Sequence, residues 1–197
     1  MVIKKLKYVF VLLSGFFLIA CSPEHIKETE IYSKGSKESS YDLKQWAFDG
    51  RLALKTKTDS WQANISWKHS IDEESIKLTG PLGQGATYIR LYGNRVSIER
   101  GDGKILISDH PEDFINQELG MFVPVKALRS WVTGIPDPSI HIIEMVNGFK
   151  QAEWMIEYDQ MQNVGVYSMP RKVTVTNAKL KLKLVIDQWN INDAITK

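Results

Sequence analysis

Apolar and polar residues alternate along most of the chain, and this two-residue period predicts a protein built mainly of β-strands. The clearest case is residues 61–67, where Trp61, Ala63, Ile65 and Trp67 alternate with polar side chains. Because successive side chains of a strand point to opposite faces, such a segment has one apolar and one polar face. Further strands are predicted at residues 52–54, 76–78, 87–92, 96–100, 104–108, 140–146, 152–158, 172–176 and 180–189.

Two short helices are predicted in the middle of the chain. The first begins at Pro111, where the missing N–H of proline is harmless, and ends at Gly120. The second covers residues 125–133, with an apolar face at helical spacing, and ends at Gly134. Strands therefore precede and follow a central helical pair. This order favours a mainly β (α+β) fold, in which the helices cover the apolar concave side of a curved antiparallel sheet or open barrel.

The first 20 residues have the pattern of an export signal. Three lysines precede apolar residues 8–20, a run too short to span a bilayer, which needs about 20 apolar residues. Leu18-Ile19-Ala20-Cys21 resembles the lipobox, in which the cysteine is acylated and becomes the new N-terminus. We therefore expect residues 1–20 to be a lipoprotein signal peptide and Cys21 to carry the lipid anchor. The alternative, a plain signal peptide, would leave the single cysteine of an exported chain as a free thiol.

The mature chain is expected to contain a tether and one domain. Residues 21–40 comprise the lipidated cysteine and a polar, flexible tether, and residues 41–197 form the folded domain. Ser22 follows the cysteine, as in lipoproteins of the outer membrane, whereas those kept at the inner membrane typically have Asp there. Removal of the signal peptide takes away three lysines and lowers the net charge from +2 to about −1. No basic excess remains that would indicate nucleic-acid binding.

The sequence shows little sign of catalytic chemistry. The four histidines, which we interpret as surface residues, lack metal-ligand spacing; they are His25, His69, His110 and His141. Three consecutive acids, at residues 72–74, are interpreted as solvated charges in a turn between strands. Residues 80–85 are rich in glycine but lack the Lys-Ser/Thr ending of a phosphate-binding loop. We expect no metal, no cofactor and no enzymatic activity, so the protein would work by affinity alone.

Six tryptophans give the chain a large apolar content, which can either fill a core or line a cavity. A sheet covered by helices can enclose a binding cavity beneath a movable cover. Strand parity and the apolar helix face then give the candidate cavity residues, which are Leu52, Leu54, Trp61, Ile65, Trp67, Leu78, Leu128 and Trp131.

The loop Pro81-Leu82-Gly83 contains an isolated leucine between turn-forming residues. Leu82 either folds back onto the rim of the barrel or projects as an exposed apolar probe. Full burial of one leucine contributes about 1.5–3 kcal/mol, which is enough to touch a bilayer without anchoring there.

The order of these motifs resembles the LolB family of outer-membrane lipoproteins over nearly all of residues 41–189. The stretches that carry the resemblance are Arg51-Leu52-Ala53 after Trp46, Trp67, Leu78-Thr79-Gly80-Pro81-Leu82-Gly83, Gly120-Met121-Phe122-Val123-Pro124-Val125, Leu128-Arg129-Ser130-Trp131, Gly134-Ile135-Pro136, Met169-Pro170 and residues 154–158 and 180–189. The resemblance implies an unclosed antiparallel barrel with a helical lid over a hydrophobic cavity. It also implies that Leu82 is the loop leucine that helps to release a client into the bilayer.

By the same resemblance, the chain is expected to be a receptor anchored at the periplasmic face of the outer membrane. It would accept acylated lipoproteins from the periplasmic carrier LolA and insert them among outer-membrane phospholipids, as a monomer and without nucleotide hydrolysis. Two alternatives stay open. One is a lipoprotein that binds a small hydrophobic ligand and delivers nothing, for which Leu82 would be dispensable. The other is a structural accessory of an outer-membrane assembly, with a rigid, filled interior.

Overall fold

The computed structural model describes Tyr32, Tyr41 and residues 43–120 and 122–191. The expected signal peptide, Cys21 and all of the expected tether except Tyr32 lie outside the described residues. The strands are β1 (Trp46–Lys55), β2 (Ser60–His69), β3 (Glu73–Thr79), β4 (Thr87–Tyr92), β5 (Arg95–Arg100), β6 (Ile105–Ser108), β7 (Ile142–Met145), β8 (Gly148–Gln151), β9 (Trp154–Val164), β10 (Tyr167–Thr176) and β11 (Lys181–Asn190). Two helices, α2 (Pro111–Leu119) and α3 (Val125–Val132), connect β6 to β7 in the described part of the chain.

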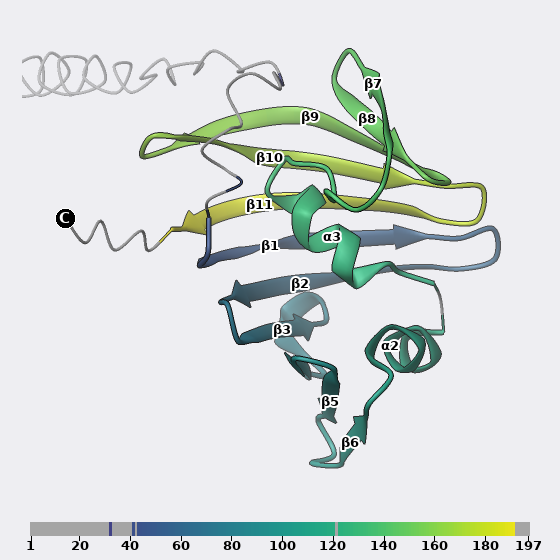
Figure 1. The fold of residues 1–197 in the computed structure, drawn as a ribbon. Coiled ribbons are helices and arrows are strands. Elements are labelled where there is room, and N and C mark those ends of the chain that lie inside the picture. Colours follow the sequence, from purple (N-terminus) through teal and green to yellow (C-terminus); the bar gives the residue numbers. More distant parts are fainter. Residues whose placement is uncertain (1–31, 33–40, 42, 121, 192–197) are drawn as a thin grey trace, which may run out of the picture.

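All eleven strands form one sheet in the order β6-β5-β4-β3-β2-β1-β11-β10-β9-β8-β7, and neighbouring strands are antiparallel. The end strands β6 and β7 are not paired with each other, so the sheet curves without closing (Figure 1). Its inner face carries the alternating apolar residues; for example, Leu52 lies opposite Leu184 on β11 and Ala63 on β2. The mainly β, unclosed antiparallel fold expected from the sequence is confirmed.

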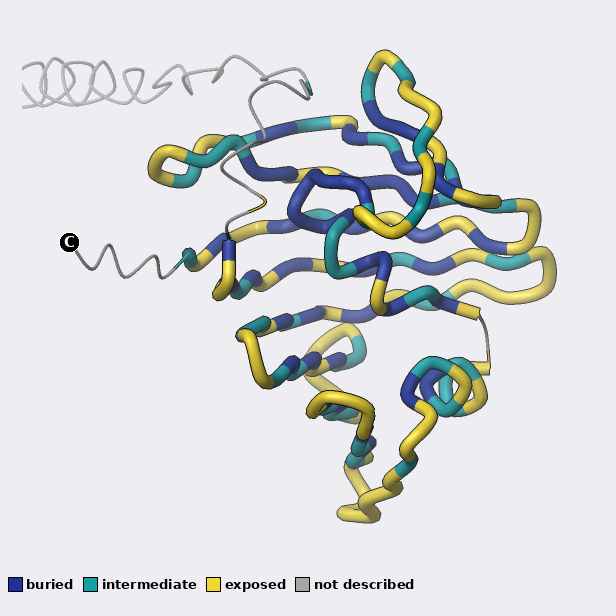
Figure 2. The backbone as a smooth tube through the Cα atoms, viewed as in Figure 1, coloured by how far each residue is buried: buried dark blue, intermediate teal, exposed yellow. Residues whose placement is uncertain are grey.

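The two helices lie on the concave side of the sheet, and α3 crosses in front of β11 and β1 (Figure 1). Helix α2 has proline in its first turn and ends at Gly120, whose φ of 69° favours glycine. Helix α3 buries five of its eight residues, and much of this segment is dark in Figure 2. Both helices therefore begin and end close to the predicted positions. Within the described residues, no helix is long and apolar enough to cross a membrane.

The structure differs from the sequence prediction near residue 150. The strand predicted to begin at Ala152 begins instead at Trp154, because Ala152 has a φ of 49° in the turn between β8 and β9. Strand β8 itself was not predicted. A Cβ atom at Gly148 would lie 1.9 Å from the carbonyl oxygen of Ile156, so only glycine allows β8 to pair this closely with β9.

Candidate functional site

A small apolar pocket of about 50 Å³ lies between the concave face of the sheet and the two helices. Every residue that lines it is aliphatic or a tryptophan. Seven of the eight cavity residues predicted from the sequence are brought together here, namely Leu52, Leu54, Trp61, Ile65, Trp67, Leu78 and Leu128. We call this space the inner pocket. It can accept only apolar groups, because a buried polar group without a hydrogen-bond partner is unfavourable.

Other lining residues of the inner pocket were not predicted; they are Ile76, Ile89, Ile115, Leu119, Val123, Val125 and Leu182. Strand parity could have found Ile76, which lies two positions from Leu78 and faces the same side of β3. Helical spacing could have found Ile115 and Leu119, which are four positions apart on α2.

Trp131, the eighth predicted cavity residue, is not among the lining residues of the inner pocket. Its indole Nε1 donates a hydrogen bond to Gln151 Oε1 at 2.6 Å, and the Tyr158 hydroxyl donates to the Trp131 carbonyl oxygen at 2.9 Å. Gln151 is fully buried and its amide also donates to the carbonyl oxygens of Asp137 and Ile140. Trp131 therefore fastens the C-terminal end of α3 to strands β8 and β9.

Aromatic side chains fill the interior beside the inner pocket. The ring centroids of Trp46 and Trp67 lie 5.5 Å apart, and those of Phe48 and Trp189 lie 5.1 Å apart. Trp46 also contacts Trp189 edge-on at 5.9 Å. Trp67 also lines the inner pocket, so this aromatic cluster directly adjoins it.

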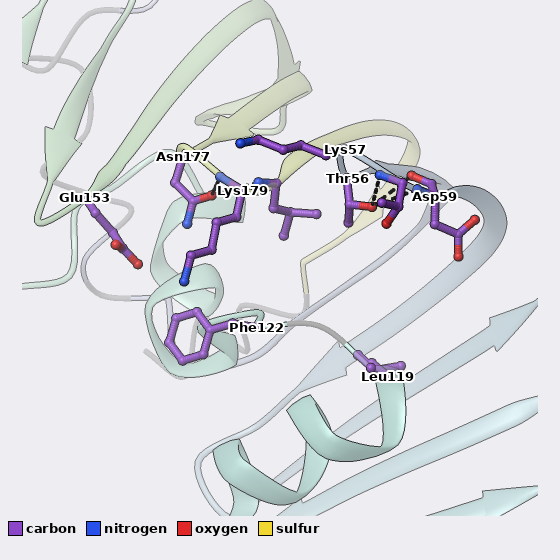
Figure 3. A pocket seen from close by; sticks show the side chains of 11 residues that line it. Thr56, Lys57, Asp59, Leu119, Phe122, Glu153, Asn177 and Lys179 are labelled. Atoms are coloured by element: carbon purple, nitrogen blue, oxygen red, sulfur yellow. Dashed lines mark hydrogen bonds between the residues drawn. The ribbon is translucent and has the colours of Figure 1, made fainter.

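A larger, open hollow of about 790 Å³ lies at the hairpin ends of the strands (Figure 3). Its wall includes Lys57 in the β1–β2 turn, Lys179 in the β10–β11 turn, and Leu119 and Phe122 beside the end of α2. Leu119 also lines the inner pocket, so the two spaces are adjacent. We call this hollow the mouth, because it is open to solvent and adjoins the inner pocket at Leu119.

The acidic turn predicted at residues 72–74 is wrong for Glu73 and Glu74, which belong to β3, and Glu74 is buried with 3% of its surface exposed. Glu74 shares the inward-facing side of β3 with Ile76 and Leu78, a parity visible in the sequence. Its carboxylate accepts a hydrogen bond from Trp67 Nε1 at 3.1 Å and forms a salt bridge with Arg129 of α3.

His69 is likewise not the surface histidine that was predicted. Its ring lies over Trp46 with centroids 5.1 Å apart, and its Nδ1 is 3.8 Å from the Glu74 carboxylate. Burial, followed by the charge of Arg129, lowers the pKa of His69 to about 4, so His69 is neutral at neutral pH. Burial also raises the pKa of Glu74, while Arg129 and the Trp67 indole partly offset that rise. Among the described residues, no cluster of three or more His, Cys, Asp or Glu side chains could hold a metal ion.

The loop after β3 places Leu82 in solvent, with 94% of its surface exposed. Residues Pro81–Gly83 form a single 3₁₀ turn, which is closed by backbone hydrogen bonds from Gly83 to Gly80 and from Gly80 to Gln84. Leu82 has a φ of 71°, a left-handed conformation that is unfavourable for leucine. Of the two positions that the sequence left open, the structure shows the projecting one.

Comparison with known proteins identifies the family. A family model described as "Outer membrane lipoprotein LolB" matches residues 44–189. Proteins named outer-membrane lipoprotein LolB are similar to this chain, among them relatives from three bacteria. The relative from Marinomonas sp. is 29% identical and covers 78% of this chain and 84% of its own length. The relative from Nitrosococcus oceani is 30% identical and covers 76% of this chain and 78% of its own length.

The third relative, from Chromohalobacter salexigens, is 31% identical and covers 91% of this chain and 86% of its own length. The family model and these relatives confirm the resemblance seen in the sequence. The chain therefore belongs to the LolB family of outer-membrane lipoproteins.

Proposed function

We propose that this chain is a membrane-anchored receptor that takes acylated lipoproteins from the soluble periplasmic carrier LolA and inserts them into the outer membrane. Lipids on Cys21 hold the receptor at the periplasmic face, and residues 22–40 tether the domain, which acts as a monomer. Two or more acyl chains on one cysteine are enough for stable anchoring. The observation that carries the proposal is the wholly apolar inner pocket beneath α2 and α3.

The inner pocket supports acyl binding because its wall matches the chemistry of a hydrocarbon chain. Each methylene group moved from water to an apolar site contributes about 0.8 kcal/mol. An acyl chain can therefore pass from a weaker site on the carrier to a stronger one here, and then into lipid, with free energy falling at each step. Such a transfer needs no nucleotide hydrolysis.

The exposed Leu82 supports delivery to a membrane. Its side chain is held away from the domain in an unfavourable backbone conformation, where it contributes no burial to the fold. Contact with the bilayer gives this side chain the apolar surroundings that it lacks in water. The role of Pro81, Leu82 and Gly83 in membrane insertion is part of the proposal.

The proposal is tested by mixing the chain from Ser22 onward with a complex of the carrier and an acylated client. This form contains every residue that the structure describes. Pull-down of the receptor should recover the client, and a client without acyl chains should stay with the carrier. If the folded receptor, offered the carrier from the same bacterium, recovers no acylated client, the proposal is wrong.

A structural role is the second candidate, and it is supported by the small volume of the inner pocket. About 50 Å³ is well below the several hundred Å³ of a typical ligand site. Acyl binding therefore requires the helices to move away from the sheet, whereas a structural accessory would keep its interior closed. The rate of hydrogen exchange in α2 and α3, measured with and without a fatty-acid probe, distinguishes the receptor from the structural role. Faster exchange with the probe supports the receptor, and unchanged exchange without binding supports the structural role.

A further inference from the structure

Three lysines form a group on the outer face of the sheet, opposite to the inner pocket. They are Lys55 on β1 and Lys181 and Lys183 on β11, and all three are exposed. On β11 they alternate with the buried residues Leu182 and Leu184, so the strand separates charge from hydrocarbon. We call these three residues the lysine group.

The lysine group has no acidic neighbour on the adjoining strands. Lys55 and Lys181 lie directly opposite each other, and the other cross-strand neighbours of Lys181 and Lys183 are Ala53, Thr174 and Thr176. Among the described residues, no salt bridge involves the lysine group, and Asp187 on the same strand is already bound by Arg51 at 2.8 Å. Like charges placed opposite each other are unfavourable in a sheet. This arrangement therefore suits an anionic partner.

The lysine group and the Leu82 loop border the same surface hollow. A space of about 670 Å³ is lined by Lys55, Lys181 and Lys183 together with Pro81, which directly precedes Leu82. A second hollow beside it is also lined by Pro81 and Lys183. One face of the domain thus presents cationic side chains next to an exposed apolar tip.

We propose that this face docks on an anionic phospholipid surface, where the lysine group binds lipid phosphates and orients Leu82 toward the acyl region. The inference rests on the proposed membrane-delivery function and adds the lipid chemistry that the domain recognises. Cations beside an apolar group are the combination that binds the interface of an anionic bilayer. A lipid surface is favoured over an acidic protein because Leu82 is the one large apolar side chain of its loop and is almost fully exposed, which suits insertion between lipids.

The test measures binding of the chain from Ser22 onward to vesicles by co-sedimentation. Vesicles contain phosphatidylcholine alone or with about one-third phosphatidylglycerol. The wild-type chain should prefer the anionic vesicles, and the preference should decline as salt rises from about 0.1 M to about 0.5 M. The double variant Lys181→Gln/Lys183→Gln should bind anionic vesicles about 30-fold more weakly, because each lysine near the lipid surface strengthens binding about fivefold.

A matched control is Lys104→Gln/Lys150→Gln, which removes the same charge from exposed lysines beside β6 and on β8. The control should bind like the wild type, and both double variants should still accept the client from the carrier. Equal binding of the wild type to neutral and anionic vesicles would overturn the inference. An equal loss of binding to anionic vesicles in the two double variants would also overturn it. Normal vesicle binding with loss of client capture would instead assign the lysine group to an acidic carrier. Failure of the wild type to capture any client contradicts the proposed receptor function, whereas the vesicle result alone decides the role of the lysines.

Discussion

At the scale of single residues, Leu82 is a functional candidate that the fold does not need. Leu82 contributes almost no buried surface and has a left-handed backbone that costs about 1 kcal/mol for a residue other than glycine. A side chain kept under these conditions stabilises nothing within the described domain. We expect its role to be a contact outside the domain, so a substitution at Leu82 should separate function from stability.

We expect Leu82→Glu to leave acyl uptake intact and to block delivery, because a carboxylate at the tip opposes entry into lipid. Uptake is measured by transfer from the carrier, and delivery by recovery of the client in vesicles. Val146→Glu is the matched control, since Val146 is also an exposed aliphatic residue in a tight turn, between β7 and β8. Loss of both uptake and delivery in folded Leu82→Glu would contradict this division of roles.

Leu82→Gly removes the apolar tip without adding charge. Glycine relieves the left-handed strain but gains freedom in the unfolded chain, and the two effects are each about 1 kcal/mol and opposite in sign. We therefore expect little change in the free energy of unfolding, measured in urea, together with reduced delivery. A large loss of stability would show that Leu82 supports the fold.

His69 should make the stability of the domain depend on pH in mildly acidic solution. Its pKa is about 4 when folded and near 6.5 when unfolded, so between these pH values only the unfolded chain takes up the proton. The contribution of His69 to the free energy of unfolding is therefore complete above pH 6.5 and is lost as pH falls toward 4. The charged groups facing it are Glu74 on β3 and Arg129 on α3. Glu74 acts in the opposite direction, because its raised pKa favours folding at low pH.

We expect the stability advantage of the wild type over His69→Gln to shrink by about 2 kcal/mol between pH 7 and pH 4. This value is below the full effect of such a shift because the ring is partly hydrated. Urea unfolding of both proteins across this range measures the difference, and a constant difference would show that His69 is already hydrated in the fold.

At the scale of elements, helix α3 contacts strands on both sides of the central pair β1 and β11 and so connects the two halves of the sheet. Arg129 reaches Glu74 on β3, while Trp131 is held by Gln151 on β8 and by Tyr158 on β9. These strands lie on opposite sides of β1 and β11 in the sheet. The helix is therefore fixed by one charged contact on one half and by hydrogen bonds on the other.

Arg129→Met should destabilise the domain by about 2 kcal/mol, because it leaves the Glu74 carboxylate buried without its partner. Glu74→Gln should cost less, since the remaining guanidinium is partly exposed. The double variant should be more stable than the sum of the two single changes implies, because neither charge is then left alone. Urea unfolding of the four proteins measures this coupling, and strict additivity would mean that the salt bridge contributes nothing.

The sequence predicted the elements with strong local signals and missed those fixed by distant contacts. Proline at the start and glycine at the end located α2. In contrast, β8 is four residues long without alternation, and its pairing depends on the close approach of Gly148 to Ile156. The cavity residues on strands followed from parity, whereas the role of Trp131 depended on Gln151, which lies 20 residues away in the chain.

At the scale of the whole molecule, the interior is nearly closed in this conformation. The inner pocket of about 50 Å³ leaves no room for an acyl chain, and the mouth of about 790 Å³ lies next to it across Leu119. The proposed acyl binding then competes with the packing of the helices against the sheet. Substitutions that loosen this packing should raise the affinity for the ligand and lower the free energy of unfolding of the ligand-free protein.

Leu78→Ala, which enlarges the inner pocket, should reduce the free energy of unfolding by about 2–4 kcal/mol and raise the affinity for a fatty-acid probe. Leu184→Ala is the matched control, because Leu184 is buried on β11 but does not line the inner pocket. It should lose similar stability without a gain in probe affinity. Urea unfolding and fluorescence titration measure the two effects, and equal changes in affinity would mean that pocket volume does not limit binding.

The free edges of the sheet have a consequence for how such a molecule can swell. A closed barrel has a fixed circumference, which it can enlarge only by breaking hydrogen bonds between strands. Here β6 and β7 share no hydrogen bonds, and the segment that bridges their gap is the pair α2 and α3. The sheet can therefore widen without breaking the hydrogen bonds between its strands. The contacts of α2 and α3 with the sheet are then what resists the widening.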